Sequence, residues 1–209
     1  MIELYAITDN PGPPLPDLAP LGALSVDGLA AVYGPASSGE VTPEALWRHE
    51  EVVEALMEDR DLLPVRYGTC LEDEATAVRA VAERRADLAV ALDQVRGAIE
   101  LAVRVLLADE RPAAAGPELS GAQYLCAKAR SASERESAIR TLHEPLSILA
   151  RASRQASPRA PSEPLRAAYL VDRPAVPAFT ALVSRLQDAN PRLRLLCTGP
   201  WPPYSFTES

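Results

Sequence analysis

The chain has 209 residues, a net charge of −8 and 47% hydrophobic residues. A chain of this size and composition buries a sizeable core, which excludes disorder along its whole length. Its best apolar run, residues 98–108, is broken by Glu100 and Arg104, so no segment reaches the roughly 18 apolar residues of a membrane-spanning helix. The N-terminus lacks the basic region of a signal peptide, and we therefore expect a cytoplasmic protein.

Charge is divided unevenly along the sequence. Residues 1–110 carry 21 acidic and 8 basic residues, whereas residues 111–209 carry 8 acidic and 13 basic ones. This asymmetry predicts two domains, an acidic one over 1–110 and a second over 111–209 that includes the C-terminal tail. The bases are dispersed among acids, which does not indicate a nucleic-acid partner. Three scattered cysteines and two histidines indicate neither a disulfide framework nor a zinc site, and we expect no metal and no cofactor.

The first hundred residues predict strands alternating with helices. Residues 2–8 read as a strand, and Asp27-Gly28 between two short apolar runs is typical of a hairpin turn. Thr42 is a typical N-cap, with proline at the first helical position, and predicts a helix over 43–59. We expect the inner face of this helix to contain Leu46, Val52, Val53, Leu56 and Met57.

The next segments are extended, helical and extended again. Pro64 bends residues 62–71, which we interpret as a short extended segment. Residues 72–95 predict one helix, and residues 98–107 alternate as a strand does, although their composition also suits a helix. The apolar stripe expected on the helix consists of Val78, Val81, Leu88, Leu92 and Val95.

The second half predicts a linker over 109–117 and a long helix over 120–153, interrupted at Pro145. A strand, a helix and a strand should follow, over 166–172, 174–189 and 193–198. This order predicts an α+β fold of two α+β domains, the second ferredoxin-like, with long helices packed on mixed or antiparallel sheets. Strand 98–107 fits either domain.

Motifs that carry chemistry are scarce. The sequence holds no phosphate-binding loop, serine-hydrolase motif or zinc-protease motif. Cys70 and His49 are a conceivable nucleophile and base, but nothing in the sequence predicts the lowered thiol pKa that such a pair needs. We expect no catalytic residue. Arg66 either binds an anion or joins two elements as a buried arginine, and the second interpretation is favoured.

The C-terminal segment GPWPPYSF (199–206) packs three aromatic residues and three prolines into eight positions. Proline favours a preformed extended backbone, and tryptophan and tyrosine are favoured contact residues at interfaces. The alternative is that this tail folds back over the core and covers an edge strand. The candidate interaction residues are Trp201, Pro202, Pro203, Tyr204, Phe206 and Arg66.

Several segments, in order along nearly the whole chain, resemble the gas vesicle protein L/F family. The resemblance is carried by WRHEEVVEALM (47–57), LLPVRYGTCL (62–71), GAIELAVRV (97–105), GAQYL (121–125), AYLVDR (168–173) and the GPWPPYSF ending. Tyr67 stands where phenylalanine is common in this family.

The resemblance implies a structural or accessory protein of the gas vesicle that is needed for assembly and is not an enzyme. It implies two α+β domains, contact with the small, apolar major shell protein and other accessory proteins, and a place in the cytoplasm and at the gas vesicle. A partner of such a shell protein needs an apolar or edge-strand docking surface with a charged rim. The acidic first half could also stack head to tail on the basic second half of another copy, or bind basic accessory proteins.

Two other function classes stay open on the sequence. A ferredoxin-like regulatory protein that binds a small ligand is the alternative, because such folds often bind metabolites between domains. A cysteine-dependent enzyme acting through Cys70 is the third reading, and it requires a thiol that reacts rapidly near neutral pH.

Overall fold

The computed structural model describes residues 1–12, 20–36, 42–107, 133, 136–137, 139–157, 159 and 163–207. The chain forms two compact units. One consists of Met1–Ile99 with Trp201–Ser209, and the other of Glu100–Pro200. The division lies eleven residues before the domain boundary expected from the sequence, and the tail is assigned to the first unit. The expected linker over 109–117 and the segment GAQYL lie outside the described residues.

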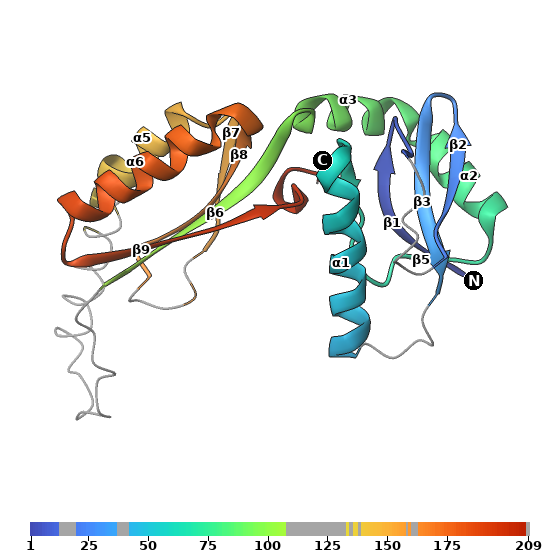
Figure 1. The fold of residues 1–209 in the computed structure, drawn as a ribbon, viewed down its shortest axis with the longest axis horizontal. Helices are drawn as coiled ribbons and strands as arrows, with labels where there is room; N and C mark the ends of the chain where they lie inside the picture. The colour runs from blue at the N-terminus through green and yellow to red at the C-terminus, as the bar shows by residue number, and fades with distance from the viewer. Residues whose placement is uncertain are drawn as a thin grey trace. The chain divides into compact units, whose positions relative to one another are not determined.

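The first unit is built on an antiparallel sheet. Its strands follow the order β2-β3-β1-β4, and β5 also pairs with β1 (Figure 1). The strands are β1 (Ile2–Thr8), β2 (Gly22–Val26), β3 (Leu29–Pro35), β4 (Leu63–Pro64) and β5 (Cys70–Leu71). The two short strands confirm that 62–71 is an extended segment bent at a proline.

The hairpin turn between β2 and β3 is confirmed. Val26 pairs with Leu29, and the two residues between them, Asp27 and Gly28, have φ values of 46° and 86°. A two-residue turn with both φ values positive matches the right-handed twist of the strands it joins. Glycine and aspartate adopt this conformation at low cost, and so the turn chemistry decides the register of the whole hairpin.

Three helices cover the first sheet. Helix α1 (Pro43–Asp59) begins as expected, with the Thr42 hydroxyl accepting a hydrogen bond from the Ala45 N–H at 3.2 Å. The expected single helix over 72–95 is wrong, because α2 (Glu74–Glu83) and α3 (Arg85–Val95) are separated at Arg84. Helix α2 contacts β2 and β3, whereas α3 contacts β4 and β1. The break lets each short helix bury its own apolar side.

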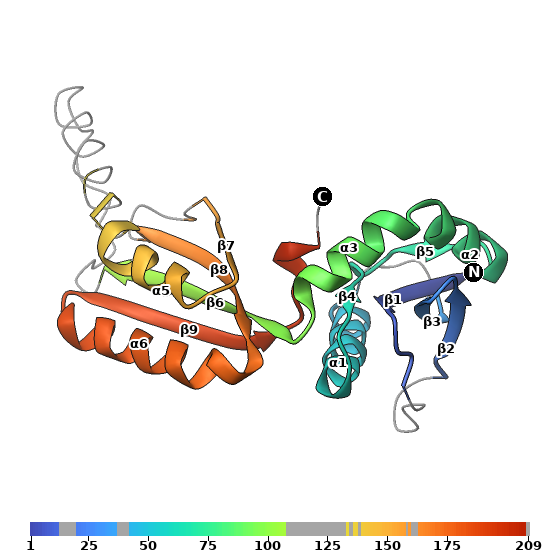
Figure 2. The ribbon, with the colours of Figure 1, turned by 90° about the horizontal axis from the view of Figure 1, so that it is seen from above.

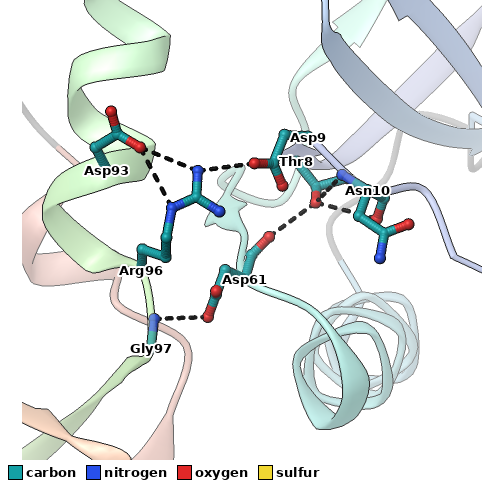
Figure 3. Close-up of polar contacts among 7 residues, drawn as sticks. All are labelled: Thr8, Asp9, Asn10, Asp61, Asp93, Arg96 and Gly97. Atoms are coloured by element: carbon teal, nitrogen blue, oxygen red, sulfur yellow. Dashed lines mark hydrogen bonds and ion pairs between the residues drawn. The ribbon is translucent and has the colours of Figure 1, made fainter.

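A polar cluster fixes the end of α3 within the first unit (Figure 3). The Asp61 carboxylate accepts the Gly97 N–H at 2.8 Å, and the Thr8 hydroxyl donates to the Asp61 carbonyl at 2.8 Å. The Arg96 guanidinium binds Asp9 and Asp93, which raise the pKa of that guanidinium. Gly97 has a φ of 67°, a conformation that suits glycine, and it turns the chain from α3 into the next strand.

The second unit is a four-stranded sheet in the order β7-β8-β6-β9. Its strands are β6 (Ala98–Leu107), β7 (Ala152–Gln155), β8 (Leu165–Asp172) and β9 (Leu193–Trp201). A helical segment, η1 (Ile139–His143) continuing into α5 (Glu144–Ile148), precedes β7, and α6 (Val176–Ala189) lies between β8 and β9. Both α5 and α6 lie on one face of the sheet (Figures 1 and 2). This element order and strand order are those of a ferredoxin-like fold and confirm the expected class.

The second unit also corrects one prediction and resolves one alternative. Residues 98–107 form a strand, and their side chains Ile99, Leu101, Val103 and Val105 are buried as the alternation predicted. The long helix expected to reach residue 153 is wrong, because the chain leaves the helix after Ile148 and enters β7 at Ala152. Pairing with β8, with Ser153 opposite Tyr169, outweighs the local helix propensity of this stretch.

Candidate interaction surface

The two segments that carry the strongest family resemblance fold around one buried pair in the first unit. His49 Nδ1 lies 3.0 Å from Glu3 Oε1, and His49 Nε2 lies 2.8 Å from the Val65 carbonyl oxygen. The Gly68 N–H donates to the same Glu3 oxygen at 3.3 Å, and Gly68 has a φ of 81°. Tyr5 stacks on the His49 ring, with 4.9 Å between ring centroids. These residues join α1, β1 and the loop before β5.

The geometry of this cluster indicates a structural role and not a catalytic one. Because a carbonyl oxygen only accepts, His49 Nε2 carries a hydrogen, and the contact between Nδ1 and Glu3 requires a second proton shared by the pair. Both ring nitrogens are therefore engaged, and His49 has no ring nitrogen left to act as a base for Cys70. Partial burial and the nearby Glu3 raise the pKa of the Cys70 thiol, which disfavours the thiolate needed for nucleophilic chemistry.

The tail packs within the first unit, and its candidate interaction residues differ in how deeply they are buried. Phe206 is buried and only 7% exposed, and Pro202 and Pro203 are buried as well. Tyr204 is half-buried, and its hydroxyl donates to Glu50 of α1 at 3.3 Å. Burial together with Glu50 raises the pKa of Tyr204, which keeps the phenol protonated as a donor. The tail is therefore anchored on α1 through the hydrogen bond between Tyr204 and Glu50.

Trp201 is the tail residue that presents a large apolar side chain to solvent. It stands at the end of β9 and is 40% exposed. Arg66, the sixth candidate, is exposed in the loop between β4 and β5, so the interpretation of Arg66 as a buried arginine is wrong. Among the sequence-derived candidates, the described structure thus leaves Trp201 and Arg66 on the surface and uses the others largely for packing.

Helix α1 adds an exposed residue that the sequence analysis missed. Trp47 is 72% exposed and Leu46 is 42% exposed, although Leu46 was expected on the inner face. Trp47 shares one side of the helix with Glu50 and Glu54, because positions three or four apart lie on one face. Trp47 stands within a carboxylate-rich stretch. This position was the sequence signal that could have identified Trp47 as exposed, because a tryptophan on a polar helix face does not pack into the core.

A cavity of about 420 Å³ lies in the first unit, between α1 and one end of the sheet. The polar residues in its lining are Arg48, Tyr5, Glu3 and Glu44. Within the described residues, no cluster of three or more His, Cys, Asp or Glu side chains could hold a metal ion. The same part of the chain contains no helix with the length and hydropathy to cross a membrane.

Comparisons with known proteins decide the family. The model of the family described as "Gas vesicle synthesis protein GvpL/GvpF" matches residues 3–208. The chain belongs to this family. It is 32% identical to gas vesicle protein L of a Streptomyces species over 78% of this chain and 68% of that protein. It is 26% identical to gas vesicle protein F2 of Halobacterium salinarum over 81% of this chain and 70% of that protein.

Solved structures agree on the fold. The crystal structure of gas vesicle protein GvpF from Anabaena covers 100% of this chain and 98% of its own, with a TM-score of 0.84 and 22% identity. GvpF from Microcystis aeruginosa matches with the same TM-score, at 20% identity over 100% of this chain and 99% of its own. At these sequence identities, the structural similarity shows a shared fold and nothing further. Membership of the GvpL/GvpF family supports a role in gas vesicle assembly.

Proposed function

We propose that this GvpL/GvpF protein acts as an accessory factor that binds the small, apolar shell protein during gas vesicle assembly, together with other accessory vesicle proteins. The family match over residues 3–208 carries this proposal. The proposed location follows from it: the protein acts in the cytoplasm and at the growing gas vesicle.

The first unit supplies a surface suited to such a partner. We define the Trp surface as the exposed side chains of Trp47 on α1 and Trp201 at the end of β9, together with Glu50 and Glu54, which lie on the same side of α1 as Trp47. Exposed tryptophan is costly in water and is a favoured anchor at protein interfaces. The tail side chains beneath Trp201 are buried or bonded to α1, so its backbone is preorganised and less entropy is lost on binding.

The distribution of charge supports the first unit as the one that binds the partner. Met1–Ile99 with Trp201–Ser209 carries 19 acidic and 7 basic residues, a net charge of −12, whereas Glu100–Pro200 carries 10 acidic and 14 basic residues, a net charge of +4. Carboxylates around apolar anchors form a charged rim that disfavours self-association and accelerates the approach of a basic partner. Contacts at this rim should weaken as salt shortens the Debye length from about 10 Å at 0.1 M to about 3 Å at 1 M.

Co-purification tests the proposal. The tagged chain is expressed with the shell protein and the other vesicle proteins of its gene cluster, and the retained proteins are quantified at low and at high salt. We expect retention of the shell protein and a decrease with Trp201→Ala, while the melting temperature of the variant stays near that of the original chain. A folded chain that never retains the shell protein contradicts direct binding.

The cavity beside α1 favours a second candidate function, the binding of a small regulatory ligand. Arg48 in its lining suits a carboxylate, and Glu44 in the same lining suits an ammonium group, so the lining fits a small zwitterion such as an amino acid better than a simple anion. A ligand that binds the folded state raises the melting temperature, so a thermal-shift screen of amino acids and nucleotides tests this candidate. A shift that disappears in Arg48→Ala would support ligand binding at this cavity.

A further inference from the structure

Strand β2 forms one edge of the first sheet and has open hydrogen-bonding positions. Val26 and Leu29 flank a two-residue turn, so they exchange hydrogen bonds, and Leu24 and Gly22 follow as the next bonded positions along β2. The intervening residues, Ala23 and Ser25, therefore direct their N–H and C=O groups away from β3. Both residues are exposed. Within the described residues, β2 pairs with β3 alone.

The β2 edge lacks the charges and prolines that strands β4, β7 and β9 carry. Strand β9, the edge of the second sheet, contains Arg194 and Pro200, and the opposite edge strand, β7, contains Arg154. Strand β4 contains Pro64. Charged side chains and prolines at an edge prevent unwanted strand addition. The sequence of β2, GALSV, has neither and carries small side chains at its two outward-facing positions.

The rest of the unit holds this edge in place. The ring of Tyr33 covers Gly22, where a Cβ atom would lie 2.5 Å from the ring, and the Tyr33 hydroxyl donates to Glu74 of α2. At the other end of β2, the Arg85 guanidinium donates to the Asp27 carbonyl at 2.9 Å. Helix α2 packs against β2. The edge is therefore a preformed template, which lowers the entropic cost of adding a strand.

We propose that β2 accepts an extended segment of the shell protein as an added strand, a site distinct from the Trp surface. This inference rests on the proposed function. Ala23 and Ser25 together offer two donors and two acceptors, which an extended backbone satisfies in register. A second copy of this chain is disfavoured as the occupant, because two units of net charge −12 would meet edge to edge. An extended partner segment that is apolar and carries little charge, as expected of the small, apolar shell protein, avoids that repulsion.

Hydrogen exchange of the co-purified complex tests this arrangement directly. In the free chain, the outward N–H groups of Ala23 and Ser25 should exchange rapidly, while the N–H of Leu24, bonded to β3, is protected. In the complex with the shell protein, we expect the exchange of Ala23 and Ser25 to slow by at least about tenfold, with Leu24 nearly unchanged.

Two substitutions at one position separate backbone pairing from side-chain contact. Ser25→Pro removes an outward N–H that the hairpin does not use, and proline is tolerated at such edge positions. Ser25→Lys keeps the N–H and adds a charge at the edge. We expect either variant to retain roughly a tenth of the shell protein retained by the original chain. The matched control, Ser25→Thr, keeps the donor and a strand-forming side chain and should retain it fully.

The outcomes distinguish this inference from the proposed function. Retention of the shell protein without protection at Ala23 and Ser25, and without loss in Ser25→Lys, overturns the strand-docking site but leaves the proposed function intact. A folded chain that never retains the shell protein overturns both. Protection of Ala23 and Ser25 in the chain alone, accompanied by dimerisation, assigns the edge to a second copy and also overturns the inference.

Discussion

The two units share a buried contact between a histidine and a strand, but their surfaces differ in net charge and in apolar exposure. Each places a histidine of one helix against a neighbouring strand: His49 of α1 contacts Glu3 of β1, and His143 of the helical segment lies 2.7 Å from the Tyr169 hydroxyl of β8. The first unit carries a net charge of −12, exposes two tryptophans and has an unprotected edge. The second carries a net charge of +4 and has arginine or proline on its edge strands.

This difference favours a division of labour in which the first unit binds the partner and the second unit serves as a scaffold. Apolar exposure and an open edge are liabilities unless a partner covers them, and they are concentrated on the first unit. Among the described residues, the second unit is the more protected, although it exposes one large apolar side chain, Ile148, which is 83% exposed on α5. Ile148 is therefore a useful control for the Trp surface.

The largest expected effect is in the core of the second unit. Phe179 of α6 is fully buried and lies 5.2 Å, centroid to centroid, from the ring of Tyr169. Phe179→Ala should lower the free energy of unfolding of this unit by about 4 kcal/mol, because it leaves a cavity beneath the helix. Calorimetric unfolding measures this loss. Ile148→Ala, on the exposed side of α5, should change the stability by less than about 0.5 kcal/mol.

The buried pair of the first unit comes next. Glu3→Ala leaves the His49 ring without its partner and should cost about 3 kcal/mol of stability, since a buried group that loses its partner keeps the desolvation cost. Glu3→Gln is the matched control, because it keeps the shape of the side chain without its charge, and its amide can either donate to His49 Nδ1 or accept the Gly68 N–H, which meet the same Glu3 oxygen. Denaturant titration compares the two variants. Equal loss in both would show that the cluster requires the carboxylate charge and not the hydrogen bonds.

A low pH should lower the stability of the second unit through protonation of His143. Burial lowers the pKa of His143 below its usual value, so the native state favours the neutral ring. The unfolded state then binds the proton more readily, and the stability contributed by this residue is full above the unfolded pKa of about 6.5 and declines as the pH falls below it. His143→Gln should flatten this part of the stability profile, measured by denaturant titration between about pH 7 and pH 5.

The smallest stability effect is expected at the Trp surface. Trp47 is largely exposed, so Trp47→Ala should change the free energy of unfolding by no more than about 0.5 kcal/mol. Thermal unfolding is the measurement. A loss of several degrees in melting temperature would mean that Trp47 packs as a structural residue and would remove it from the interaction surface.

The sequence predicted the local features of the fold well. The Thr42 cap and the Asp27-Gly28 turn were predictable because their chemistry acts over two or three residues. Three features depended on contacts distant in sequence: the break at Arg84, strand β7 and the pairing of Glu3 with His49. Arg84 separates two helices because they pack on different strands, and local propensity carries no information about that choice.

The candidate surface was predicted only in outline. The aromatic tail marked the right region, but composition could not tell that Phe206 is buried while Trp201 remains exposed. Trp47 was missed because its neighbours in sequence suggested an ordinary charged helix face. Its side of α1 also carries Glu50, which contacts Tyr204 of the tail, a residue 154 positions away in the chain.

One matched measurement tests the division of labour most directly. Trp47→Ser and Ile148→Ser each replace a large exposed side chain with a small polar one, in the first and the second unit respectively. Each tagged variant is expressed with the shell protein, and the retained amount is quantified. We predict that Trp47→Ser lowers retention severalfold while Ile148→Ser leaves it unchanged. Equal retention by both variants, or a loss confined to Ile148→Ser, would contradict the assignment of shell-protein binding to the first unit.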